Sequence, residues 1–138
     1  MDEGRAFGSR LTVLPNCIIE SFGNDAELIV GDNCFFSYGV ILSITMKIEL
    51  RKHVWIGEYT SLRDATHQFK TNKVLGELND KHAPILIGNN VWIGKGCIIL
   101  LGTVIDDNVI VAANSSVKGE LHSNAMYGGC PARLIKKL

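Results

Sequence analysis

The sequence predicts an all-β chain wound as a parallel β-helix, and three features of its repeat indicate this class. Aliphatic residues recur at a fixed interval of six along one stretch of the chain: Ile87, Ile93, Ile99, Ile105, Val111 and Val117. The fifth place of each hexapeptide holds a mostly small or β-branched residue: Val91, Cys97, Thr103, Val109, Ser115 and Leu121. Small residues follow three of the aliphatic positions, where bulk would crowd a bend: Gly88, Gly94 and Ala112. A period of six fits neither a helix nor a simple strand, but it suits a chain that turns a corner every six residues and stacks on itself.

The same period extends upstream with one slip. Two further sets keep the interval of six, with a shift of two residues between them: Val30, Phe36 and Leu42, then Leu50, Ile56 and Leu62. We therefore expect a bulge or register adjustment in residues 44–47. Residues 1–28 are less regular, and we expect irregular early coils there that cap the open end of the stack.

A polar segment interrupts the repeat between Leu62 and Ile87, whose separation is not a multiple of six. The segment spans about 63–84, carries two histidines and two aspartates, and has little aliphatic periodicity. The stacked coils form a three-sided prism, and we expect an insertion of that length to project from it. Projecting loops on a rigid scaffold often carry function.

Length and composition agree with a single domain over residues 1–138. The chain is 46% hydrophobic and has 14 Gly, enough for one core and its corners. Lys plus Arg and Asp plus Glu number 14 each, so no global field indicates a nucleic acid partner. There is no apolar run of 18 residues and no signal peptide, and the four cysteines share no close spacing. We therefore expect free thiols in a cytoplasmic protein that does not insert into a membrane.

Two motifs carry a resemblance to a known family. The run from Pro84 to Gly94, PILIGNNVWIG, and the run from Gly128 to Arg133, GGCPAR, resemble the hexapeptide-repeat acyltransferases. The branch is similar to galactoside, maltose and xenobiotic acetyltransferases and to O-acetyltransferases of surface-polysaccharide clusters, over about Val30 to Lys137. The resemblance implies a left-handed β-helix and a homotrimer, with acetyl-coenzyme A bound in a groove between neighbouring prisms. The handedness comes from the resemblance alone, because the general rule for parallel crossovers predicts right-handed turns.

The candidate general base is His67, in the run RDATHQ that follows Leu62. Acetyl transfer to a hydroxyl needs a base, and histidine suits this role because its unperturbed pKa of about 6.5 lies near operating pH. In the family, a histidine in the loop before the Pro-x-x-Ile-Gly motif has this role, and His67 matches that position. Asp64 could orient the imidazole, contact the acceptor or cap a turn.

The resemblance also implies residues that line the acetyl donor. Trp92 stands where the family often has an aromatic residue beside the catalytic histidine, although packing between protomers would also explain it. Lys95 and Ala113 are one full coil apart and therefore stacked, and in the family both positions line the pantetheine arm. Basic residues are expected to meet the nucleotide phosphates, unless they form only a solvated tail: Lys118, Arg133, Lys136 and Lys137.

Two departures from the family pattern bear on the substrates. The family commonly has Thr-Lys-Asp and then Pro after the last repeat, whereas this chain has KGEL from Lys118, so we expect the phosphate contact to shift to Lys118. The sugar-binding carboxylate of galactoside acetyltransferases would align near residues 44–45, where no acid stands. Ser43 and Thr45 are the nearest polar candidates for contact with an acceptor.

These observations predict an acetyl-coenzyme A-dependent O-acetyltransferase acting on a sugar or other small hydroxylated acceptor, with surface-polysaccharide biosynthesis as one setting. N-acetylation of an amino sugar is a variant of this function. A non-catalytic β-helix scaffold is the alternative from another class, although it would have no use for a histidine-bearing loop. A zinc hydratase would need closely spaced histidines, and the four histidines here are far apart, so we expect no metal. A covalent acyl-cysteine is also disfavoured, because the loop around His67 holds no cysteine.

Overall fold

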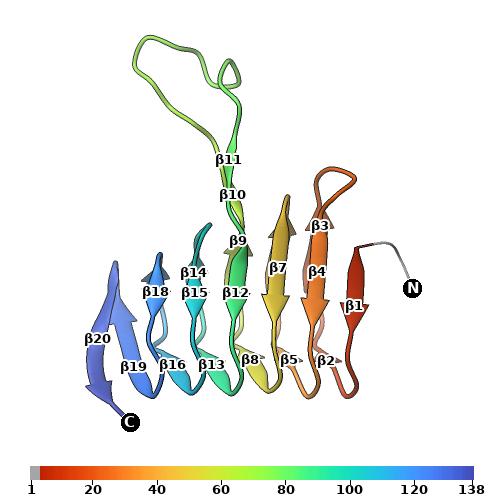
Figure 1. Ribbon diagram of the computed structural model, residues 1–138, viewed down its shortest axis with the longest axis vertical. Helices are drawn as coiled ribbons and strands as arrows, with labels where there is room; N and C mark the ends of the chain where they lie inside the picture. Colours follow the sequence, from red (N-terminus) through yellow and green to blue (C-terminus); the bar gives the residue numbers. More distant parts are fainter. Residues whose placement is uncertain (1–3) are drawn as a thin grey trace.

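The computed structural model describes residues 4–138, which form a left-handed parallel β-helix of about six turns with three faces (Figure 1). Face A is a six-stranded parallel sheet of β1 (Arg5–Phe7), β4 (Glu27–Val30), β7 (Lys47–Leu50), β12 (Ile85–Ile87), β15 (Val104–Ile105) and β18 (Glu120–Leu121). Face B has seven strands: β2 (Thr12–Val13), β5 (Phe35–Phe36), β8 (Val54–Ile56), β13 (Val91–Ile93), β16 (Val109–Val111), β19 (Ala125–Gly129) and β20 (Ala132–Lys137). Face C has five: β3 (Ile18–Ser21), β6 (Ile41–Ile44), β9 (Ser61–Arg63), β14 (Ile98–Ile99) and β17 (Ser116–Val117).

Two short strands lie outside the prism. They are β10 (Ala65–Thr66) and β11 (Lys81–His82), which pair with each other in antiparallel register. Within residues 4–138 no helix has the length and apolar character needed to cross a membrane.

The predicted inward positions form columns along the prism interior. One residue of each strand stacks on its equivalent in the next coil: Leu50, Ile87 and Ile105 on face A; Ile56, Ile93 and Val111 on face B; Leu62, Ile99 and Val117 on face C. All of these side chains are buried. Each buried aliphatic side chain contributes about 1.5–3 kcal/mol relative to exposure, so the columns account for much of the stability.

The corner between faces A and B uses a residue with a left-handed backbone in each of several coils. The residues there have φ between 56° and 59°: Asn33, His53, Asn90, Asn108 and Asn124. Asparagine accepts this conformation more readily than other residues with a side chain, because its amide bonds locally. The amides also join the coils, since Nδ2 of Asn90 donates to Asn108 at 2.9 Å and Nδ2 of Asn108 donates to Asn124 at 3.0 Å.

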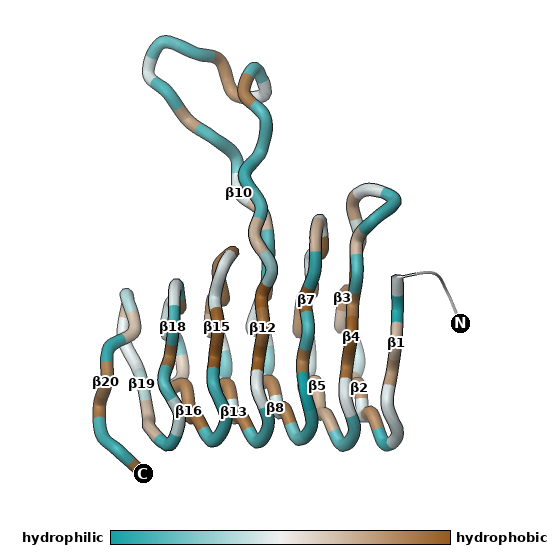
Figure 2. Tube along the Cα trace, viewed as in Figure 1, coloured by the Kyte–Doolittle hydropathy of each residue, from teal (hydrophilic) through white to brown (hydrophobic). Residues whose placement is uncertain are grey.

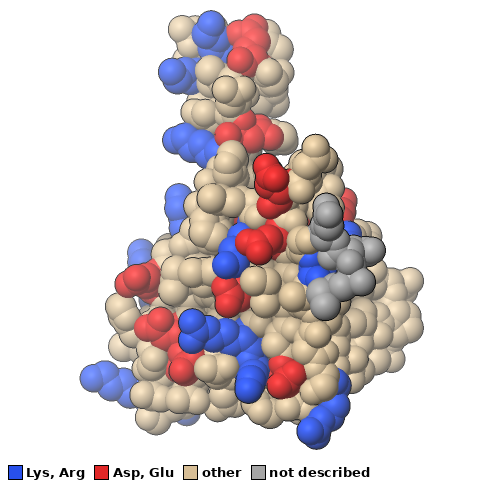
Figure 3. Space-filling model, turned by 45° about the vertical axis from the view of Figure 1, so that its right-hand side comes forward, with Lys and Arg blue, Asp and Glu red and all other residues tan. Residues whose placement is uncertain are grey.

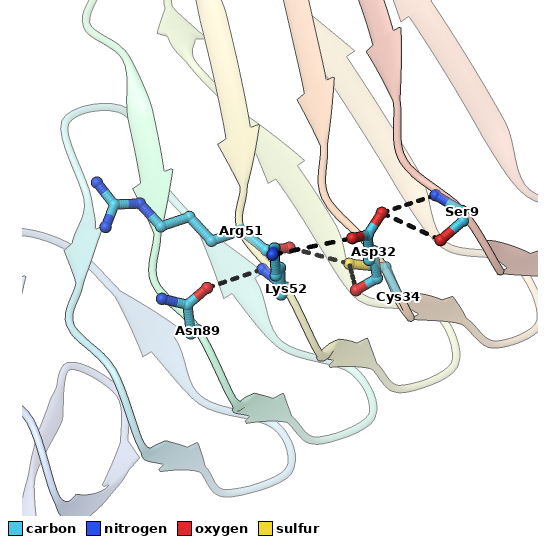
Figure 4. A network of polar contacts seen from close by, with 6 residues as sticks. All are labelled: Ser9, Asp32, Cys34, Arg51, Lys52 and Asn89. Atoms are coloured by element: carbon cyan, nitrogen blue, oxygen red, sulfur yellow. Dashed lines mark hydrogen bonds and ion pairs between the residues drawn. The ribbon is translucent and has the colours of Figure 1, made fainter.

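A second polar network ties the same corner nearer the N-terminus (Figure 4). Oδ1 of Asp32 accepts hydrogen bonds from the backbone N–H of Ser9 at 2.8 Å and from the Ser9 hydroxyl at 3.2 Å. These two bonds lower the pKa of Asp32, the backbone bond most. The backbone N–H of Lys52 donates to Oδ1 of Asn89 at 3.0 Å, which links the next coils.

The N-terminal coils differ from the prediction, whereas the register adjustment at residues 44–47 agrees with it. Irregular coils were expected over residues 1–28, of which 1–3 lie outside the described residues. The described part is regular, because β3 pairs with β6 from Ile18–Ile41 to Ser21–Ile44 and β1 pairs with β4. Backbone pairing supplies this order where the aliphatic period is weak. The register adjustment at residues 44–47 is present, where β6 and β7 have four residues each and add Ile44 and Ile48 to the core. At the other end β20 folds back antiparallel on β19.

Candidate functional site

The predicted projecting loop is present as an arm of residues 64–84 between β9 and β12. Figure 1 shows the arm leaving the prism with β10 and β11 at its base. It is mostly hydrophilic, with short apolar stretches (Figure 2), and its exposed apolar side chains are Phe69, Val74 and Leu75. Basic and acidic side chains are interspersed along the arm in the view of Figure 3. The arm therefore presents both polar groups and unburied apolar side chains beside the prism.

Asp64 fixes the base of the arm to the prism. Its side chain is fully buried, and its oxygens accept hydrogen bonds from the backbone N–H groups of Thr45, Met46 and Lys47 at 2.7, 2.6 and 2.7 Å. Of the three roles considered for Asp64, the structure shows the turn cap. The expectation of an acceptor contact conflicts with this geometry, because the turn amides occupy both oxygens and no solvent reaches them.

The other two residues expected to contact an acceptor, Ser43 and Thr45, lie near the foot of the arm. Ser43 lies between Glu20 and Arg63 on neighbouring strands of face C. The guanidinium of Arg63 is 3.7 Å from the Glu20 carboxylate, and this ion pair spans the strand that carries Ser43. Ser43 is only 3% exposed. This burial does not favour its contact with an acceptor, which stays a prediction. Thr45 is half-buried in the turn that Asp64 caps.

His67 lies at the start of the outer loop of the arm, just beyond β10. Its Nδ1 is 2.8 Å from Oδ1 of Asp80. Next to this pair, Nε2 of Gln68 donates to the backbone oxygen of Asn79 at 2.6 Å. Asp80, not Asp64, is therefore the carboxylate that holds the imidazole. Sequence reasoning missed Asp80. In an antiparallel arm, residues at the same distance from the prism on the two sides lie opposite each other, and this signal could have found it.

A groove of about 430 Å³ opens beside His67, between the arm and the prism. It is lined by residues of the arm and of the neighbouring coils: Thr66, His67, Gln68, Phe69, Lys81, Ala83, Leu101 and Lys118. Of the residues expected to line the donor, only Lys118 shares this groove with His67. The two lysines give the groove a positive character, and Phe69 and Leu101 give it apolar walls.

The remaining expected donor residues lie on other parts of the surface. Lys95 and Ala113 are stacked, as expected, at the corner between faces B and C, where Asn114 N–H donates to the Lys95 oxygen at 2.8 Å. Both are exposed, and the backbone of Ala113 has no hydrogen-bond partner within the described part of the chain. The basic residues of β20, Arg133 and Lys136, are also exposed. A single chain therefore does not bring these residues together with His67.

Trp92 faces outward from face B and is 58% exposed. It lies beside Trp55 of the preceding coil, which is 56% exposed. The two indoles line an apolar groove of about 540 Å³, with Val91, Val109 and Ile110 among its other walls. So much exposed aromatic surface on one sheet marks a contact surface and not a part of the core.

The described cysteines provide neither an activated nucleophile among the buried thiols nor part of a metal site. Burial raises the pKa of the Cys34 and Cys97 thiols, so these two are poor nucleophiles at neutral pH. Among residues 4–138 there is no group of three or more His, Cys, Asp or Glu side chains placed to hold a metal ion.

Comparison with known proteins agrees with the repeat and with the fold. A family model described as bacterial transferase hexapeptide (six repeats) matches residues 84–119. A maltose O-acetyltransferase from Clostridium difficile 630 superposes with a TM-score of 0.83 at 31% identity, over 96% of this chain and 69% of that one. A hexapeptide-repeat acetyltransferase from Vibrio cholerae, complexed with acetyl-coenzyme A, superposes with a TM-score of 0.85 at 29% identity, over 98% and 71%.

Among curated sequences, galactoside O-acetyltransferase from Escherichia coli strain K12 is 32% identical over 118 residues, 83% of this chain and 46% of that protein. The chain spans about half the length of several curated relatives that it matches. The hexapeptide repeat, the three-faced fold and these likenesses show that the chain belongs to the hexapeptide-repeat acetyltransferase family.

Proposed function

We propose that the chain transfers an acetyl group from acetyl-coenzyme A to a hydroxyl of a sugar or another small acceptor, with His67 as the general base. The observation that carries the proposal is an imidazole held at 2.8 Å by a carboxylate beside an open groove. A relative that binds acetyl-coenzyme A and relatives named as O-acetyltransferases of maltose and galactoside support the donor and the kind of acceptor.

The proposed reaction is direct transfer with both substrates bound. His67 takes the hydroxyl proton as the oxygen attacks the thioester carbon and forms a tetrahedral oxyanion. The oxyanion then collapses and the C–S bond breaks. The thiolate leaves with the proton that His67 accepted, so the products are the acetyl ester and free coenzyme A. Backbone N–H groups near the groove are the donors that would stabilise the oxyanion.

The donor site is proposed to form between copies of the chain in a homotrimer. Residues on faces and corners away from the arm would supply it, with Trp92, Lys95 and Ala113 along the pantetheine and with Lys118, Arg133 and Lys136 at the phosphates. The open backbone of Ala113 fits this role, because a pantetheine amide needs a peptide partner. The exposed indoles of face B and the exposed apolar side chains of the arm are surfaces that assembly would cover.

His67→Ala tests this function against that of a scaffold. We expect turnover to fall by roughly 100-fold or more, the usual scale for a removed general base. The measurement is release of the coenzyme A thiol with a panel of sugars, amino sugars and polysaccharide precursors. His122→Ala is the matched control, since His122 is also exposed and also lies near a carboxylate, 3.7 Å from Asp106.

Two outcomes would contradict the proposal. One is a folded His67→Ala protein with turnover near that of the wild type. The other is a wild-type protein whose melting temperature does not rise with acetyl-coenzyme A, because a ligand that binds only the native state must stabilise it.

A further inference from the structure

The contact between His67 and Asp80 lies one residue beyond the paired base of the arm. In the antiparallel register of β10 and β11, Ala65 faces His82 and Thr66 faces Lys81. The next residues outward along each side are His67 and Asp80, followed by Gln68 and Asn79. Both of these further pairs are bonded, at 2.8 and 2.6 Å. Strand pairing ends at Thr66 and Lys81, so the contacts beyond it are made by the side chains of His67, Asp80 and Gln68. The short ladder below them holds the two sides of the arm close enough for these contacts.

The atoms in contact determine which nitrogen of His67 can act. An ionised carboxylate only accepts hydrogen bonds, so Nδ1 of His67 must carry the hydrogen that it donates to Asp80. In the neutral imidazole this leaves the lone pair on Nε2. Without such a partner both tautomers would form, and the ring would be free to rotate about its side-chain bonds.

We propose that Asp80 is the positioning residue for His67: it selects the Nδ1–H tautomer and aims Nε2 at the acceptor hydroxyl. This inference rests on the proposed function, in which His67 is the base. The hydroxyl proton moves to Nε2, the Nδ1 hydrogen stays bonded to Asp80, and the positive imidazolium then lies against a negative carboxylate. When the thiolate leaves, Nε2 gives the proton back and the same tautomer is restored.

No other acidic group of the arm is placed for this role. The oxygens of Asp64 are taken by the three turn amides. The carboxylate of Glu77 lies 3.8 Å from the ammonium of Lys73, four residues away along the loop. Asp80 is therefore the carboxylate through which the chain can act on His67, and Glu77 provides a control in the same loop.

The decisive variant is Asp80→Asn, with Glu77→Gln as the matched control. The introduced amide keeps the size of the side chain but can donate to Nδ1, which favours the tautomer with hydrogen on Nε2 and blocks the base. We expect kcat to fall roughly tenfold or more, in the manner of the carboxylate in a Ser-His-Asp triad, with the KM for acetyl-coenzyme A within about twofold of wild type. Glu77→Gln should leave both constants unchanged.

Two further readouts separate positioning from a purely structural role. The ¹⁵N chemical shifts of the His67 ring, assigned by their loss in His67→Ala, should report hydrogen on Nδ1 in the wild type and a shift toward Nε2 in Asp80→Asn. In the background of His67→Ala, the further change Asp80→Asn should cost no additional turnover, because Asp80 acts through His67.

The inference is overturned if Asp80→Asn keeps the wild-type kcat, if the His67 tautomer is the same in both proteins, or if the two substitutions are additive. The tautomer measurement needs neither acceptor nor turnover. A wild-type protein that acetylates no acceptor would thus refute the proposed function, and the ring nitrogens would still decide whether Asp80 positions the imidazole.

Discussion

At the residue scale, Asp64 shows how a polar side chain of the arm can serve the fold while its neighbours serve the site. Its carboxylate enters the prism and accepts three backbone N–H groups of the turn after β6. Two of those amides belong to the turn between β6 and β7, and the third belongs to Lys47, the first residue of β7. Asp64 thereby fixes the foot of the arm to the turn at residues 45–47. His67 lies three residues further along the chain from this anchor.

Substitution of Asp64 should therefore act on stability. Asp64→Asn replaces one accepting oxygen with a donor that faces backbone N–H groups, so we expect the free energy of unfolding to fall by about 2–4 kcal/mol. Urea unfolding at one fixed protein concentration measures the change. Asp25→Asn, in the exposed turn between β3 and β4, should alter it by less than about 0.5 kcal/mol. An Asp64→Asn protein that unfolds at the wild-type urea concentration would show that the cap contributes little.

At the element scale, successive side chains of a strand alternate between the interior of the prism and its outer surface. In β14, Ile99 is fully buried in the column with Leu62 and Val117, whereas Ile98 is 50% exposed on the outer surface of face C. The two residues have the same side chain and the same strand, so they differ only in the direction in which they point.

This pair predicts a sharp contrast in stability. Ile99→Ala should cost about 2–5 kcal/mol, because it leaves a cavity among packed coils that cannot close over it. Ile98→Ala should cost less than about 1 kcal/mol, because solvent fills the space. Urea unfolding of both variants measures the difference. Equal costs would mean that the inward column does not carry the stability of the stack.

The strands also show what the sequence could and could not predict. The period of Ile87, Ile93 and Ile99 was sufficient to assign the core, because one inward side chain per face leaves a direct mark on the sequence. The antiparallel arm offered only a weaker signal for Asp80, because β10 and β11 are two residues long and the contact with His67 lies just beyond them. The burial of Ser43 was equally hidden, because the residues beside it on face C, Glu20 and Arg63, come from other coils.

At the scale of the whole molecule, the handedness of the coil was available only from the family resemblance, since composition and spacing allow either sense. The stacking also decides which residues share a surface. It places His67 at the corner between faces C and A, Trp92 on face B, and Lys95 at the corner between faces B and C. One prism holds these groups apart, so a site that uses all of them requires a second prism. A heterologous contact that closes into a ring provides one site per copy.

Assembly into the proposed trimer can be tested at Trp55. Its indole is 56% exposed beside Trp92 and lines the apolar groove of face B. Trp55→Lys would place a charge in a surface that the proposed trimer buries between copies, so we expect that trimer to dissociate toward monomer. Sedimentation velocity over a range of concentrations measures this. A wild-type protein that sediments as a monomer at every concentration would contradict the assembly, and it would leave the indoles of face B open to solvent.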